Sequence, residues 1–92
     1  MATGFVLIRT APRSEHEVFG VVRGLKEVAE AYNVFGECEI VAKVVADDYQ
    51  RIGDVVVDII RSTKGIVWTK TLVSVAFENP TMRRSILGPG YI

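Results

Sequence analysis

The fold of this chain is decided by residues 28–44, which read VAEAYNVFGECEIVAKV. Apolar residues alternate with polar or small ones on both sides of Gly36, and the connection after that glycine is acidic. Alternating runs that flank a glycine-containing turn are typical of two antiparallel strands joined as a hairpin. We therefore expect strands over residues 28–35 and 39–46, with carboxylates at the turn between them.

Further elements are expected on both sides of this hairpin. Residues 4–10 form a β-branched and aromatic run that ends before Pro12, which is typical of a buried strand. Ser14 and Glu17 have the spacing of a helix capping box, which predicts a helix start. Apolar residues follow at helical spacing and give this helix one apolar face: Val18, Val21, Val22 and Leu25.

A second helix is expected after the hairpin. Asp47 and Asp48 compete as its N-cap, and Asp47 with Gln50 makes a second capping-box pair. Its buried face is supplied by Ile52, Val55, Val56, Ile59 and Ile60. Gly65 then ends the connection, and residues 66–77 form a long strand rich in valine, threonine and tryptophan.

The order of these elements predicts the fold class. Strand, helix, strand, strand, helix, strand is the α+β ferredoxin-like βαββαβ arrangement, with two helices on one face of a four-stranded antiparallel sheet. Alternation in the last strand places Ile66, Trp68 and Leu72 together, and the opposite face is apolar as well. One layer of helices cannot bury both faces. We therefore expect these three residues to pack against a second copy in a dimeric α/β barrel.

Composition limits the classes of function. The chain has 92 residues, and its eleven Lys and Arg balance eleven Asp and Glu to a formal net charge of zero. Direct nucleic-acid binding normally requires a basic excess, so none is expected. The apolar runs are far shorter than the roughly 20 residues that span a bilayer. With a single cysteine and no leader-like opening pattern, a cytoplasmic protein without a membrane partner is expected.

The chain length corresponds to one small domain. We expect this domain over residues 1–78, closed by Asn79 and Pro80, and a C-terminal tail over residues 79–92. The tail combines two arginines with apolar residues and glycines. It is either a frayed terminus or an arm that docks on a neighbouring subunit.

One group of residues has the chemistry to hold a free amino acid. An amino acid presents an ammonium group, which needs a carboxylate or carbonyl, and a carboxylate, which needs N–H or hydroxyl donors. The turn residues Gly36, Glu37, Cys38 and Glu39, with Thr69 and Thr71 of the last strand, offer both kinds of group.

These residues resemble the effector-binding domain of the Lrp/AsnC family of amino-acid-sensing transcription regulators. In that family a glycine followed by two residues and an acid comes after the second strand, and the last strand carries Thr-x-Thr. Gly36 and Glu39 match the first motif, and Thr69 and Thr71 match the second. Three positions depart from the family pattern: Glu39 replaces the usual aspartate, Cys38 a frequent aromatic residue, and Phe35 a frequent threonine.

The resemblance implies a stand-alone amino-acid-sensing domain and not an enzyme. Its ligand site would comprise Phe35, Gly36, Glu37, Cys38, Glu39, Thr69 and Thr71, where the hairpins and last strands of neighbouring dimers meet in a ring. The partners implied are a free amino acid, further copies of the chain and a full-length regulator of the same family.

Two other interpretations remain open from the residues alone. Ferredoxin-like barrels also host small monooxygenases and isomerases, and a ligand-free oligomerisation module would need the same fold. The only histidine, His16, falls in the first helical turn, away from Cys38 in sequence, and metal-ligand spacing is missing. We therefore expect no catalytic residues, no metal and no cofactor.

Overall fold

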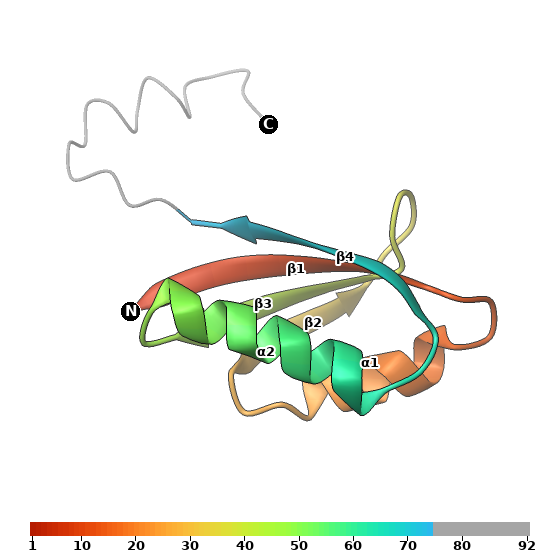
Figure 1. Ribbon diagram of the computed structural model, residues 1–92. Helices are drawn as coiled ribbons and strands as arrows, with labels where there is room; N and C mark the ends of the chain where they lie inside the picture. The colour runs from red at the N-terminus through yellow and green to blue at the C-terminus, as the bar shows by residue number, and fades with distance from the viewer. Residues whose placement is uncertain (75–92) are drawn as a thin grey trace, which may run out of the picture.

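The computed structural model of the chain describes residues 1–74, which form a four-stranded antiparallel sheet with two helices on one face (Figure 1). The elements are β1 (Ala2–Thr10), α1 (Glu15–Arg23), β2 (Val28–Asn33), β3 (Ile40–Ala46), α2 (Tyr49–Ser62) and β4 (Ile66–Val73). The strands lie in the order β2-β3-β1-β4. The predicted ferredoxin-like fold is confirmed.

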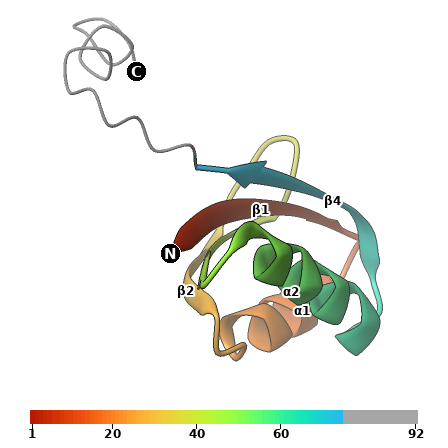
Figure 2. The same ribbon diagram turned by 60° about the vertical axis from the view of Figure 1, so that its left-hand side comes forward.

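The core lies between the sheet and the two helices, which run side by side across it (Figure 2). Alternate residues of β1 and β3 face the helices and are buried, because a strand directs successive side chains to opposite faces. The largest fully buried side chains are Val6, Ile8, Val18, Val22, Ile40, Val44, Ile52, Val55 and Ile59.

The apolar faces of the helices differ from expectation in two places. α1 ends at Arg23, so Leu25 follows the helix, although it still packs against the core. Ile60 was expected on the buried face of α2 but is 48% exposed. The buried stripe of α2 follows Ile52, Val55 and Ile59, and the next residue is rotated about 100° away from it.

Only one of the expected helix caps is formed by a side chain. Asp48, and not Asp47, caps α2, since its carboxylate accepts the backbone N–H of Arg51 at 2.8 Å. Ser14 precedes α1 but makes no capping hydrogen bond. Its backbone is already helical (φ −98°, ψ −11°), whereas a capping residue needs an extended backbone to aim its oxygen at the first turn. The predicted capping box of Ser14 and Glu17 is therefore wrong.

An irregularity between β1 and β4 corrects the predicted outer face of the sheet. The register shifts between Arg9 and Thr10, so that Trp68 pairs with Arg9 but Ile66 pairs with the buried Thr10. Ile66 therefore packs against the core on the helix side. It does not share a face with Trp68, as simple alternation predicted. Leu72 pairs with Phe5, and both are on the face without helices.

Three expectations concern residues outside the described range: strand residues 75–77, the domain end at residue 78 and the tail over residues 79–92. Within residues 1–74, no helix has the length and apolar character needed to cross a membrane.

Candidate ligand-binding cavity

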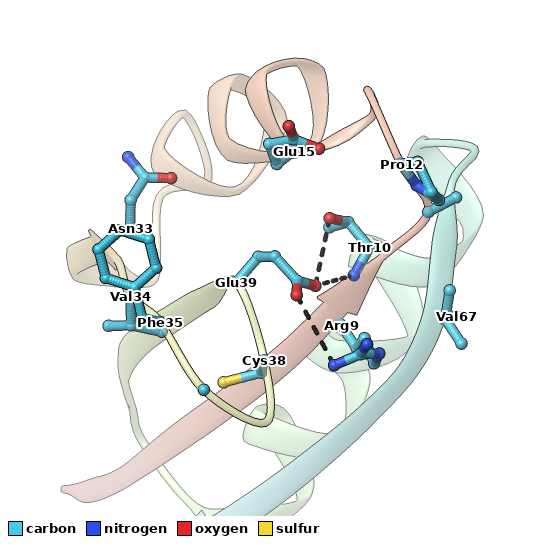
Figure 3. A pocket seen from close by; sticks show the side chains of 12 residues that line it. Arg9, Thr10, Pro12, Glu15, Asn33, Val34, Phe35, Cys38, Glu39 and Val67 are labelled. Carbon is cyan, nitrogen blue, oxygen red and sulfur yellow. Dashed lines mark hydrogen bonds and ion pairs between the residues drawn. The ribbon is translucent and has the colours of Figure 1, made fainter.

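A cavity of about 550 Å³ opens at the end of the sheet where β1 and β2 finish and β3 and β4 begin (Figure 3). Its walls come from the end of β1 and the turn after it, the start of α1, the β2–β3 hairpin and the bulged start of β4. The lining residues are Arg9, Thr10, Ala11, Pro12, Glu15, Asn33, Val34, Phe35, Gly36, Cys38, Glu39 and Val67.

Glu39 is fixed in the cavity wall through both its backbone and its side chain. Its N–H donates to the carbonyl of Ile8 at 3.0 Å, and its own carbonyl accepts the N–H of Val34 at 2.9 Å. Its carboxylate oxygen Oε1 accepts the backbone N–H of Thr10 at 2.6 Å and lies 3.4 Å from the Thr10 hydroxyl. The β1–β3 ladder stops at the pair Ile8 and Ile40, so this side chain satisfies the next N–H of β1.

Arg9 brings a positive charge to the same wall. Its Nη1 donates to the carbonyl of Glu37 at 2.8 Å and lies 3.7 Å from Oε2 of Glu39. Among residues 1–74, no donor makes a hydrogen bond to this second carboxylate oxygen. The Arg9 side chain remains 45% exposed and that of Glu39 31% exposed. A guanidinium and a carboxylate thus lie side by side, and the remaining N–H groups of Arg9 and Oε2 of Glu39 can each form a hydrogen bond with a ligand.

Four of the residues predicted for the site line this cavity together: Phe35, Gly36, Cys38 and Glu39. The Phe35 side chain is fully exposed, whereas Cys38 is buried. Gly36 has a φ of +120°, which lies in the region that favours glycine and lets the hairpin turn. Glu37 contributes its carbonyl to Arg9, while its own side chain is exposed outside the lining.

The two predicted threonines lie elsewhere in the subunit. Thr69 pairs with Ile8 and Thr71 with Val6, so both are on the helix-facing side of the edge strand β4. Neither lines the cavity of its own subunit. Their role in a site shared between subunits stays a prediction.

Sequence reasoning missed the part of the cavity that comes from the first strand and helix. Arg9, Thr10 and Glu15 precede Glu39 by more than twenty positions, and only the sheet order brings β1 beside β3. The available signal was a polar pair, Arg9 and Thr10, at the end of an otherwise apolar run. Within the described residues, no cluster of three or more His, Cys, Asp or Glu side chains is suited to hold a metal ion.

Comparison with known proteins identifies relatives of this chain. An uncharacterised HTH-type transcriptional regulator of Pyrococcus horikoshii is 36% identical over 75 residues, which cover 78% of this chain and 50% of the relative. The chain therefore spans about half the length of this relative. A crystal structure from Thermus thermophilus matches 86% of this chain and 99% of its own, with 34% identity and a TM-score of 0.78.

A more distant match shares the fold alone. The transcriptional regulator NMB0573 of Neisseria meningitidis, solved as a complex with L-Met, has a TM-score of 0.69 at 18% identity, over 85% of this chain and 52% of that one. The family model of the Lrp/AsnC ligand binding domain matches residues 3–86. Because that match covers nearly the whole chain, the protein belongs to the Lrp/AsnC ligand-binding domain family.

Proposed function

We propose that this domain binds a free amino acid in the cavity beside Glu39 and thereby modulates transcription through a partner regulator. The observation that carries the proposal is the pair of opposite charges, Arg9 and Glu39, set 3.7 Å apart in the cavity wall. An amino acid carries the complementary pair of charges on neighbouring atoms. The cavity, at about 550 Å³, falls within the range of roughly 300–1,000 Å³ that small-molecule sites occupy.

In this arrangement each charged group of the ligand has a partner. Oε2 of Glu39 accepts the ligand ammonium, while Oε1 stays with Thr10. The N–H groups of Arg9 that do not bind the carbonyl of Glu37 donate to the ligand carboxylate. Hydrogen bonds to charged groups contribute about 1.5–3 kcal/mol each, enough to select a zwitterion over an uncharged molecule. The L-Met complex of the Neisseria regulator supports this ligand class.

We further propose that neighbouring subunits complete the site. The cavity is open, and the fully exposed Phe35 stands at the tip of its hairpin. An exposed aromatic side chain at a binding site is typical of a surface that another subunit covers. Thr69 and Thr71 would reach the ligand from such a neighbour in a ring of dimers. The dimers would form through the outer face of the sheet, where Trp68 and Leu72 lie.

The regulatory step is proposed to require a partner that contacts DNA. The Pyrococcus relative is a transcriptional regulator about twice as long as the matched region. The chain itself has a formal net charge of zero, which disfavours direct contact with phosphates. A full-length regulator of the same family, assembled with this domain, would transmit the signal.

The enzymatic alternative finds less support. Monooxygenases and isomerases of this fold class would need a polar or ionisable group between the helices and the sheet. Among the described residues, that interface is filled by apolar side chains, and Thr10 is the one buried polar residue. Two Pyrococcus relatives are named as uncharacterised HTH-type transcriptional regulators, which favours a protein that is not an enzyme.

Isothermal titration calorimetry against the twenty amino acids tests the proposal. At least one should bind with a Kd below about 1 mM, which corresponds to roughly −4 kcal/mol. Arg9→Gln should weaken binding of that amino acid by about ten-fold or more, since it removes a charge-assisted partner. Arg61→Gln is the matched control, because Arg61 lies in the last turn of α2 and does not line the cavity.

Two results would contradict the proposal: no amino acid binds, or Arg9→Gln binds as tightly as the parent chain. Glu39→Gln gives a second test of the same site. Glutamine retains an oxygen for the N–H of Thr10 but loses the charge that would hold the ligand ammonium, so the domain should fold and fail to bind.

A further inference from the structure

The cavity contains a third charged side chain that the zwitterion site does not use. Glu15, the first residue of α1, lines the cavity, and Figure 3 shows it across the open space from Glu39. Among residues 1–74, the ion pairs are Arg9 with Glu39, Lys43 with Glu30 and Arg51 with Glu27. Glu15 takes part in none of them and makes no side-chain hydrogen bond within that range.

The charges of the cavity therefore do not balance. Arg9 and Glu39 cancel each other, and the remaining lining residues other than Glu15 are uncharged. A ligand whose ammonium and carboxylate occupy Glu39 and Arg9 leaves Glu15 facing the rest of the molecule. Covering this carboxylate with an apolar or acidic group would cost solvation without a partner, whereas a cationic group would form a charge-assisted hydrogen bond.

The apolar part of the cavity lining suits the stem of such a ligand. Val34, Pro12 and Val67 give the cavity apolar surface, and Cys38 adds a buried sulfur-containing side chain. A chain of methylene groups can lie against these residues while its charged end stays near the opening. Long cationic side chains behave in this way on protein surfaces, with the stem packed and the head solvated.

We propose that the effector is an amino acid with a cationic side chain, of the lysine, ornithine or arginine type, and that Glu15 determines this specificity. The inference rests on the proposed amino-acid site. It adds the charge of the ligand side chain, which the Arg9–Glu39 pair leaves undetermined.

Matched ligands test the charge directly. Lysine and norleucine share the same backbone and the same number of side-chain carbons, and only lysine carries the terminal ammonium. Calorimetry on the unmodified chain should show lysine, or a shorter or longer cationic homologue, binding up to about five-fold tighter than norleucine, with glutamate weakest. A five-fold ratio corresponds to about 1 kcal/mol, the upper value for a partly exposed ion pair.

Paired variants then assign the preference to one residue. Glu15→Gln should remove most of the lysine preference, because lysine binds less tightly and norleucine, which no longer covers a charged carboxylate, binds at least as tightly as it binds the parent chain. Glu17→Gln removes an acid from the same helical turn, outside the cavity lining, and should leave the preference intact. It controls for net charge and for the helix start. The melting temperature of each variant shows whether it is folded.

The outcomes separate this inference from the proposed function. If norleucine and lysine bind equally, or if a neutral or acidic amino acid binds best, the site exists but the inference about Glu15 is overturned. The same holds if Glu15→Gln keeps the full preference. If no amino acid binds the unmodified chain, the amino-acid site itself fails, and the inference fails with it.

Discussion

Oε1 of Glu39 accepts the backbone N–H of Thr10 at 2.6 Å, just beyond the last paired residues of the β1–β3 ladder. This contact gives the predicted ligand acid a structural role as well. Glu39→Ala would leave a partly buried N–H without a partner, which costs about 1–3 kcal/mol of unfolding free energy. Glu39→Gln keeps an acceptor in place and should cost clearly less. Urea denaturation of both variants measures the difference, and equal losses would show that the contact does not stabilise the fold.

Gly65 should tolerate substitution far less well than Gly20. Gly65 has a φ of +89°, and a Cβ there would overlap the side chain of Ser14. Its carbonyl also accepts the N–H of Ala11 at 2.7 Å, so it ties the start of β4 to the turn before α1. Gly65→Ala should therefore lose at least about 1–2 kcal/mol from the left-handed backbone alone.

Gly20 is the matched control, because it lies in α1 with nothing within 4 Å of an added Cβ. Gly20→Ala should raise stability by about 0.5–1 kcal/mol, since alanine is the better helix residue. Chemical denaturation compares the two variants. In the double variant with Ser14→Gly, the steric part of the Gly65→Ala loss should be recovered while the backbone part remains. A Gly65→Ala variant as stable as the parent would contradict the turn geometry.

The ion pair between Glu27 and Arg51 should make the free energy of unfolding depend on pH. Arg51 donates Nε at 2.9 Å to Oε2 of Glu27, and this contact holds the pKa of Glu27 below its ordinary value of 4.5. The same contact raises the pKa of Arg51. A carboxyl whose folded pKa is lowered stabilises the fold above its unfolded pKa, and the contribution is lost as the pH falls through the folded value.

The stability advantage of the parent chain over Glu27→Gln should therefore be present at neutral pH and shrink in acid, below the ordinary pKa of 4.5. Thermal melting of both proteins across this range measures it. Glu17→Gln serves as the control, because Glu17 forms no ion pair within residues 1–74. If the difference between parent and Glu27→Gln stays constant down to low pH, the ion pair does not couple to folding.

The sequence predicts the fold well because the responsible signals are local. Alternation along β3, after Gly36, and the helical spacing of Ile52, Val55 and Ile59 in α2 report directly which side of these two elements is buried. The bulge that turns Ile66 toward the helices has no such local signal in the sequence. It depends on how β4 meets β1 at Thr10, and no residue type in the strand marks the extra position.

The candidate site was only half predictable for a related reason. Glu39 and its hairpin carry a recognisable motif. Arg9 reaches the cavity because β1 lies beside β3, and Glu15 because α1 begins at the same end of the sheet. The predicted capping box at Ser14 failed for a similar reason, because residue spacing does not determine backbone conformation. The spacing of Ser14 to Glu17 suits a capping box, but the backbone conformation of Ser14, next to Gly65, decides against one.

The outer face of the sheet provides the last prediction, that the domain is a dimer. Leu72 and Phe5 pair across β4 and β1, and they are 49% and 39% exposed on the face without helices. Burial of each large apolar side chain in a second sheet would contribute about 1.5–3 kcal/mol. Leu72→Glu should therefore shift the protein from dimer toward monomer, because it places an unpaired charge in that interface.

Ile60→Glu is the matched control for this experiment. Ile60 is 48% exposed, nearly the same as Leu72, but it lies on α2 on the opposite side of the molecule. Sedimentation analysis should find Ile60→Glu dimeric and both Leu72→Glu and Trp68→Glu dissociated at micromolar concentration. If the parent chain is already a stable monomer there, the outer face does not form the interface, and the proposed ring of dimers that completes the ligand site cannot be built through it.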